Sequence, residues 1–313
     1  METKIMHFAN FNITFGEKEE PMLLHFEDVI FPAFTGNYKR GKEEGYPKLG
    51  FSDVEIKQTK DEDYVLVGNY IKDTQYNIRT TIQNGELTSS PARVPTAPYS
   101  RFIIFLKNHR MILVRNESSS PDIRSFQATV RDILNKYIRE KNKGIKKADK
   151  LSQLPFAIVN IVDIPLKEDI ESILKAVHKI NWIQLQFFPL NNDLNPLPIA
   201  QAINDEMGRV GSRTANAKFN SPDSKQGVKK MLEDTAGLAR TTMSITDEEG
   251  ETKKIKEESF SSNKIIPFSR DINSSDDEHL ITIAKQDAVI SITSPDNLTL
   301  YERFVGIIGR LMI

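Results

Sequence analysis

An acidic run followed by a lysine comes nearest to a catalytic set in this sequence. Asp247, Glu251 and Lys253 lie within the segment DEEGETK. A metal-dependent nuclease needs two or more carboxylate oxygens to hold Mg²⁺, and often a lysine beside the attacked phosphate. The same letters also suit an exposed hairpin turn, in which Gly250 supplies a positive φ and the acids face water. We favour the turn and expect no catalytic residue and no metal site, with a nuclease as the alternative.

Other catalytic and cofactor motifs are missing. The chain contains no cysteine, which excludes disulfides, thiolate nucleophiles and Cys-ligated zinc or iron–sulfur sites. No phosphate loop, dinucleotide-binding fingerprint or nucleophile elbow is present. The histidines lie far apart, without the i, i+4 spacing of a helical metal site: His7, His25, His109, His178 and His279. We therefore expect no cofactor.

A cluster of cations near the middle of the chain is the clearest sign of a binding partner. The net charge of the chain is −1, yet between residues 136 and 150 seven basic side chains face only Glu140 and Asp149. Such a local excess attracts polyanions by releasing their condensed counterions, without any need for a particular base sequence. A solvated helix end is the plainer alternative. The predicted nucleic-acid contacts, with DNA preferred over RNA, are Lys136, Arg139, Lys141, Lys143, Lys146, Lys147 and Lys150, together with a smaller cluster of Lys229, Lys230 and Arg240.

A second candidate surface is the expected strand that begins at Trp182. Its alternation places Trp182, Gln184, Gln186 and Phe188 on one face, and Ile183, Leu185 and Phe187 on the other. In RNA-binding sheets an uncovered face presents aromatic rings on which bases stack. Alternatively, a neighbouring helix or the N-terminal domain covers that face.

Length and patterning indicate an α+β protein of two domains. A chain of 313 residues suits two domains of ordinary size. We expect a β-rich N-terminal domain over residues 1–120, a basic amphipathic helix and linker over 121–150, and a C-terminal domain over 151–313. In the first part, hairpins are predicted at 53–71 and 101–115. Between them we expect a strand at 76–82, which stops at the turn Asn84-Gly85, and a connection at 93–98.

The linking helix has the clearest periodicity. Apolar residues recur at three- and four-residue spacing from Ile123 to Ile138, with Arg124, Arg131 and Arg139 on the opposite side. Gly144 is expected to end this helix.

The second half predicts a ferredoxin-like (βαββαβ) C-terminal domain with an added helix and a β-ribbon. It should open with a right-handed βαβ unit, whose two strands lie in one sheet. The expected elements are a strand at 156–164, a helix at 166–180, a strand at 182–190, the added helix at 196–210, a strand at 213–220, a helix at 224–233, a strand at 239–246, the ribbon at 251–258, a helix at 278–285 and a last strand at 288–293.

We expect neither a secretory signal nor a membrane anchor from the two ends of the sequence. The N-terminus begins with alternation rather than with a basic segment and an apolar run. The apolar C-terminus, LTLYERFVGIIGRLMI, falls short of the ~20 residues that span a bilayer, so we expect a docked helix or a dimer contact. Together with the lack of cysteine, this favours a cytoplasmic protein.

The order of these elements resembles the family of the Rex exclusion protein A of lambda-type phages and related defence-island proteins. The matching stretches are residues 97–134, a strand pair before a helix, and residues 183–256, with FFPL, GVKKMLEDTAGL and SITDEEGETKKI in comparable positions. The resemblance implies an intracellular protein of phage–host conflict that contacts DNA through basic residues, as a dimer and without chemistry of its own. A non-catalytic nucleic-acid-binding protein is thus our first expectation. The alternatives are the nuclease and an interaction or sensor subunit of a defence system.

Overall fold

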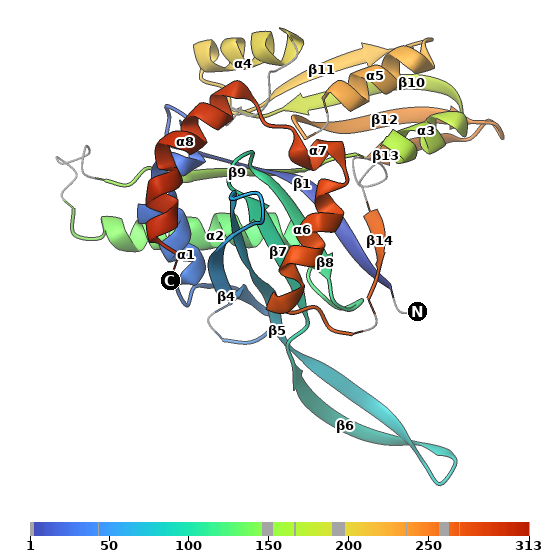
Figure 1. The fold of residues 1–313 in the computed structure, drawn as a ribbon. Coiled ribbons are helices and arrows are strands. Elements are labelled where there is room, and N and C mark those ends of the chain that lie inside the picture. The colour runs from blue at the N-terminus through green and yellow to red at the C-terminus, as the bar shows by residue number, and fades with distance from the viewer. Residues whose placement is uncertain are drawn as a thin grey trace.

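Two antiparallel sheets and the helices around them form an α+β structure, as the sequence predicts (Figure 1). The computed structural model describes residues 3–42, 44–145, 153–165, 167–189, 198–235, 237–256, 263–268 and 270–312. Within these ranges, the large sheet has ten strands and the small sheet has four.

The large sheet draws strands from both halves of the chain. Its main path is β14 (Asn263–Pro267), β1 (Thr3–Phe15), β8 (Arg110–Arg115), β7 (Tyr99–Phe105), β5 (Tyr64–Gln83), β4 (Lys48–Gln58) and β3 (Lys39–Arg40). Off this path, β2 (Glu20–Pro21) and β9 (Ala157–Asp163) pair with β1, and β6 (Glu86–Thr96) pairs with β5. The predicted hairpins at 53–71 and 101–115 are confirmed as β4–β5 and β7–β8.

Both faces of the large sheet are buried, each in its own core. Along β8, Met111 and Leu113 enter one core while Ile112 and Val114 enter the other, as the two-residue period of a strand requires. The first core lies under α1 (Phe31–Thr35), α2 (Ile123–Asn142), α8 (Pro295–Arg310) and the short helices at Met22–His25 and Phe26–Ile30; the second lies under α6 (Asp277–Lys285) and α7 (Ala288–Ser291). The expected docked C-terminal helix is therefore confirmed. No helix in the described ranges is long and apolar enough to cross a membrane.

The linking helix forms as predicted. The Asp122 side chain caps it by accepting the Ser125 N–H at 2.8 Å, and its apolar stripe is buried in the first core. It ends at Asn142, and Gly144 follows with a φ of 89°.

Polar side chains of α2 cover the outer edge of β9. Arg131 donates to the Val159 carbonyl at 3.1 Å, and Asn135 accepts the Ala157 N–H at 3.1 Å. Gln127 also donates to the Val159 carbonyl, at 3.3 Å. An uncovered edge strand invites pairing with other chains, so these contacts satisfy an edge that would otherwise be exposed.

The predicted βαβ unit does not form. β9 lies in the large sheet beside β1, whereas β10 (Val177–Phe187) lies in the small sheet, beyond α3 (Lys167–Lys175). The small-sheet order is β11 (Ala215–Asn220), β10, β12 (Ala239–Asp247) and β13 (Thr252–Lys256). A ferredoxin-like order would place β9 between β12 and β11, so that arrangement is not confirmed. The physical reason is that β9, paired with β1, buries Ala157, Val159 and Ile161 in the first core of the large sheet.

Several other predicted elements shift. The expected boundary at residue 150 does not separate the two sheets. The later strands β9 and β14 belong to the large sheet, and the helices α6 and α8 pack against it. The prediction of a last strand at 288–293 is wrong, because this segment contains the helix α7, which buries Ile290. The side-chain amide of Asn108 donates a hydrogen bond to the Ile290 carbonyl. The added helix is confirmed as α4 (Pro198–Val210), and the helix after it as α5 (Lys225–Asp234).

The small sheet is tied to β1 by two asparagines. The Asn10 amide donates to the Gly237 carbonyl at 3.0 Å, and the Asn12 amide donates to the Pro189 carbonyl at 2.7 Å. Both bonds are buried. Since Pro189 follows β10 and Gly237 precedes β12, these contacts fix where the two central strands of the small sheet leave the body of the protein.

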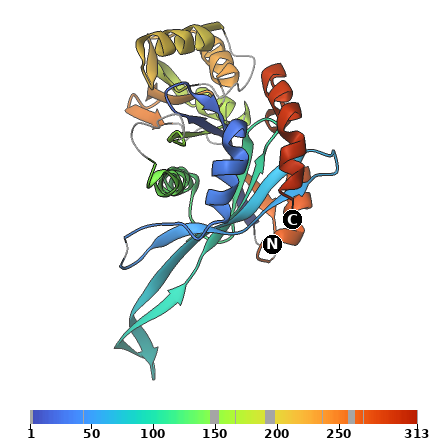
Figure 2. The same ribbon diagram turned by 90° about the vertical axis from the view of Figure 1, so that its left-hand side faces the viewer.

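A two-stranded arm projects from the body (Figures 1 and 2). It consists of residues 74–96, where β5 continues beyond the sheet and pairs only with β6. The predicted turn is present, with φ of 54° at Asn84 and 85° at Gly85. The predicted connection at 93–98 is instead mostly strand, because its prolines lie where the ribbon has free outer edges.

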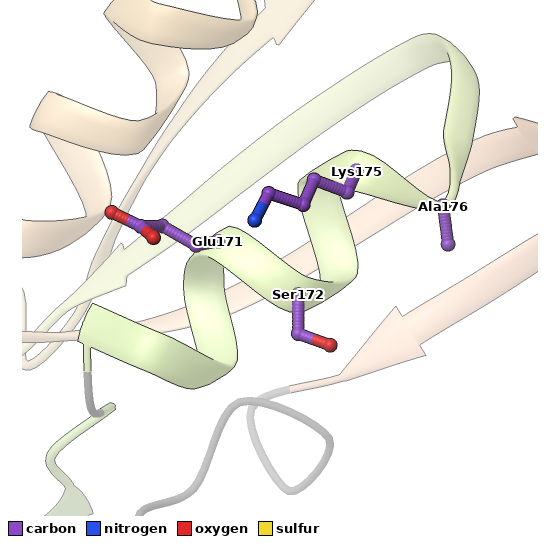
Figure 3. A pocket seen from close by; sticks show the side chains of 4 residues that line it. All are labelled: Glu171, Ser172, Lys175 and Ala176. Atoms are coloured by element: carbon purple, nitrogen blue, oxygen red, sulfur yellow. The ribbon is translucent and has the colours of Figure 1, made fainter.

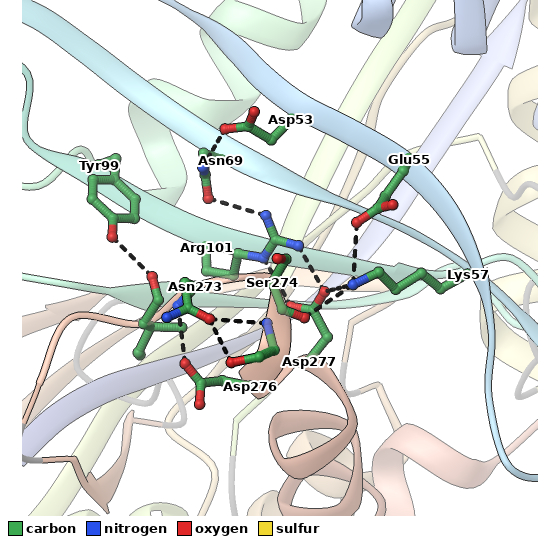
Figure 4. A network of polar contacts seen from close by, with 12 residues as sticks. Asp53, Glu55, Lys57, Asn69, Tyr99, Arg101, Asn273, Ser274, Asp276 and Asp277 are labelled. Atoms are coloured by element: carbon green, nitrogen blue, oxygen red, sulfur yellow. Dashed lines mark hydrogen bonds and ion pairs between the residues drawn. The ribbon is translucent and has the colours of Figure 1, made fainter. Parts of the chain in front are cut away.

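A buried ion pair fastens α6 to the large sheet (Figure 4). The Arg101 guanidinium donates twice to the Asp277 carboxylate, at 2.8 and 2.6 Å, and their side chains are only 1% and 2% exposed. Lys57 of β4 donates to the same carboxylate at 2.8 Å. Asn69 of β5 accepts a further bond from Arg101, at 3.1 Å. One aspartate at the start of α6 thus bonds to β7 and β4, and Arg101 extends this network to β5.

Candidate nucleic-acid interface

Within the described residues, α3, α4 and α5 cover one face of the small sheet, and none of these three helices lies on the other. The buried residues Ile183 of β10 and Met243 of β12 pack against α3 and α5, and Leu185 packs against α4. The added helix therefore covers the face opposite Trp182. Trp182 and Gln184 are half-buried, and neighbouring Lys218 is exposed.

We call the side opposite these helices the basic face and define it by strand register. Trp182 pairs with Asn220 and Ser244, and Gln184 pairs with Lys218 and Thr242. The basic face thus consists of Trp182, Gln184, Gln186, Asn216, Lys218, Asn220, Arg240, Thr242, Ser244, Lys254 and Lys256.

Two lysines lie beside the tryptophan of the basic face. The Lys218 ammonium lies 4.9 Å from the centroid of the Trp182 indole, and the Lys254 ammonium lies 5.8 Å from it. The only acid within the four described strands is Asp247, at the end of β12 and on the opposite face. Among the described residues, neither of these lysines forms an ion pair. The face therefore combines an aromatic platform with two lysines that form no ion pair within the described part of the chain.

The basic end of α2 is partly engaged by the protein itself. Lys136 forms a 2.7 Å ion pair with Asp132 and donates to the Lys39 carbonyl at 2.8 Å. The Arg139 guanidinium lies 5.9 Å from the centroid of the Phe156 ring.

Two of the remaining predicted cations of this cluster, Lys141 and Lys143, lie within the described residues. The Lys141 ammonium lies 5.4 Å from the Tyr137 ring centroid, and Lys143 is exposed directly after the helix. Lys146, Lys147 and Lys150 lie outside the described residues.

The smaller predicted cluster is split between two surfaces. Lys229 on α5 pairs with Glu171 and, at 3.8 Å, with Glu233, while Lys230 is exposed on the same helix. Both lie on the helix-covered side of the small sheet. Arg240 belongs to the basic face, so the structure brings it together with Lys218, Lys254 and Lys256, which sequence reasoning missed.

A hollow of about 540 Å³ lies beside α3, on the helix side (Figure 3). Glu171, Ser172, Lys175 and Ala176 line it, and Glu171 is the partner of Lys229. Because acid and base compensate each other here, the hollow does not extend the basic surface.

The acidic segment after β12 forms the predicted turn. Asp247 accepts the backbone N–H groups of Glu249 and Glu251, at 3.1 and 2.9 Å, and Gly250 has a φ of 85°. Its carboxylate also pairs with Lys253 at 2.5 Å, and this bond lowers the pKa of Asp247. The carboxylates of Asp247, Glu249 and Glu251 lie within 4.8 Å of one another, a spacing that could hold a cation. In this arrangement the lysine competes with any metal for Asp247.

No protein-family model, curated protein or solved structure matches this chain. The function proposed below therefore rests on the geometry of the basic face.

Proposed function

We propose that this protein binds nucleic acid through the basic face without reading its base sequence. The observation that carries this proposal is Trp182, exposed in part and flanked by Lys218 and Lys254 on a face where the four described strands place no acid. Bases stack on such rings whatever their identity, and the surrounding ammonium groups attract the phosphates. A half-exposed platform of this kind suits single strands, whose bases are free to stack.

The predicted end of α2 adds a second basic surface to this proposal. Arg139, Lys141 and Lys143 would contact phosphates outside the basic face, without base recognition. We propose DNA as the ligand. This choice, together with action in the cytoplasm in phage exclusion or phage defence, as a dimer or with a partner protein, rests on the resemblance to the Rex exclusion family alone.

The salt dependence of binding tests the mechanism. If Lys218, Lys254, Lys256 and Arg240 each neutralise one phosphate, the logarithm of the affinity should fall with the logarithm of the salt concentration at a slope of about −3, from ~0.7 per contact on a single strand. Seven contacts from the end of α2 on duplex DNA would instead give a slope of about −6. Since Trp182 is the only tryptophan, its fluorescence reports binding directly.

Two controls accompany this titration. The double variant Lys218→Glu, Lys254→Glu should weaken binding to strands of every base composition equally, whereas loss on one sequence alone would mean base readout. The oligonucleotide should be recovered intact after incubation with Mg²⁺, whereas shortened products would favour the nuclease. A slope near zero would rule out the proposed electrostatic contacts.

A further inference from the structure

The arm formed by residues 74–96 has an apolar face that lies open to solvent. Successive side chains of a strand point to opposite faces, and residues paired across two strands share a face. Tyr76 pairs with Val94 near the body, and Ile82 pairs with Leu87 near the tip. We call these the inner pair and the outer pair. All four residues lie on one face of the arm and are 46% to 75% exposed.

The other face of the arm is polar. Its charged and hydrogen-bonding side chains are Gln75, Asn77, Arg79, Thr81, Gln83, Glu86, Thr88 and Arg93. Antiparallel strands with this alternation ordinarily pack their apolar face on a core. In the described part of the chain, none of the hydrophobic cores includes a residue of the arm. The apolar face therefore has the pattern of a covered surface, without a cover among the described residues.

The two apolar pairs are placed symmetrically along the arm. The strands β5 and β6 shift register between Ile78 and Thr80, and the inner and outer pairs lie equally far from Arg79 in this bulge. A two-fold axis through the bulge would therefore lay the inner pair of one arm on the outer pair of a second arm. It would also lay Ile78 and Ala92 on the smaller Thr80 and Ser89. The face is thus complementary to a copy of itself.

The charges of the arm favour an antiparallel overlap of two copies. Arg93 lies in the half near the body, Arg79 lies midway and Glu86 lies at the tip. Antiparallel arms bring the negative tip of each level with the positive half of the other, whereas parallel arms would bring like charges level. Because the arm projects from the body, the two bodies then lie at opposite ends of the overlap (Figures 1 and 2).

We propose that the arm is a dimerisation element, in which the apolar faces of two arms pack face to face and antiparallel. The inner pair of each arm then contacts the outer pair of the other. Two ribbons stacked in this way gain the second layer that a lone two-stranded ribbon lacks in water. The proposal depends on the arm alone, so its tests leave the basic face unchanged.

The size of this contact sets the expected strength of the dimer. The strand β6 has 11 residues, which span about 36 Å at ~3.3 Å per residue, and two strands make a face about 10 Å wide. Two such faces bury on the order of 1,000 Å² together, which is below the ~1,200–2,000 Å² of stable complexes. We therefore expect a reversible dimer with a dissociation constant of about 10–100 µM.

Sedimentation equilibrium of the full-length protein, from about 1 to about 300 µM, tests the association. The average mass of the wild type should rise from that of one chain toward that of two. Ile82→Glu should weaken association about tenfold or more, because the two-fold contact would bury the introduced carboxylate twice without a partner. The matched control is Thr88→Glu, which adds the same charge on the polar face, beside Leu87, and should associate as the wild type does.

Two outcomes of this measurement would overturn the proposal. A wild type that stays monomeric over the whole range would exclude a second copy and leave the apolar face to a partner of another kind. Equal loss in Ile82→Glu and Thr88→Glu would show that the apolar face does not make the contact.

A mixture of two variants tests the antiparallel arrangement through a gain, which misfolding cannot imitate. Tyr76→Lys and Ile82→Glu should each be largely monomeric alone. When they are mixed, the introduced ammonium of one chain lies over the introduced carboxylate of the other, while the second half of the contact keeps its native side chains. The mixture should therefore associate more strongly than either variant alone. No gain on mixing would contradict the antiparallel overlap, because parallel arms do not bring positions 76 and 82 together.

Discussion

Replacing Asp277 with alanine is expected to lower the free energy of unfolding by about 3–5 kcal/mol, the cost of breaking a buried ion pair from one side. The reason is that the Arg101 guanidinium, only 1% exposed, would keep its charge without its carboxylate partner. Lys57 would lose the same partner and add a second positive charge nearby. Chemical denaturation monitored by circular dichroism measures the change.

Two comparisons make this prediction specific. Asp73→Ala removes an exposed partner, 3.4 Å from Lys39, and should cost no more than about 1 kcal/mol. The double variant Arg101→Met, Asp277→Leu removes both charges and should be more stable than Asp277→Ala alone, because no uncompensated charge remains buried. If Asp277→Ala is as stable as Asp73→Ala, the pair does not fasten α6.

Replacing Trp182 with alanine is expected to weaken the binding of single-stranded DNA about fivefold to a hundredfold, corresponding to ~1–3 kcal/mol per stacked base. The change removes the aromatic platform while leaving Lys218 and Lys254 in place. Anisotropy of a labelled oligonucleotide measures the affinity, since the variant has no tryptophan fluorescence. Trp182→Phe keeps an aromatic ring and should retain most of the affinity.

Phe219 on β11 supplies the matched control. It is 37% exposed but pairs with Ile183, so it lies on the helix-covered side of the small sheet. Phe219→Ala should therefore bind DNA as the wild type does. Equal loss in both variants would show that the sheet as a whole was disturbed and that Trp182 has no separate role in binding.

Local patterns in the sequence predicted local structure well. The helical stripe from Ile123 to Ile138 and the Asn84-Gly85 turn each depend on neighbours in the chain, and both are present. The pairing of β9 with β1 could not be read in the same way. A continuous apolar run such as β9 shows that a strand is buried on both faces, but not which strand lies beside it.

For the proposed binding surface, too, the sequence predicted the local pattern but not the contacts between distant segments. Alternation correctly placed Trp182 opposite Ile183. The surrounding cations were missed because Lys218 and Lys254 lie far apart in the chain and meet only through the sheet register. Charge density along the sequence favoured the end of α2 instead, where Lys136 turned out to have an acidic partner in Asp132.

The arm formed by residues 74–96 has a practical consequence. It makes no contribution to either core of the large sheet, and its side chains Tyr76, Ile82 and Leu87 are each more than half exposed. An isolated two-stranded ribbon is only marginally stable in water. Its tip at Asn84-Gly85 is thus the place to graft a fluorophore or an affinity tag, because an insertion there leaves both cores and the lysines of the basic face untouched.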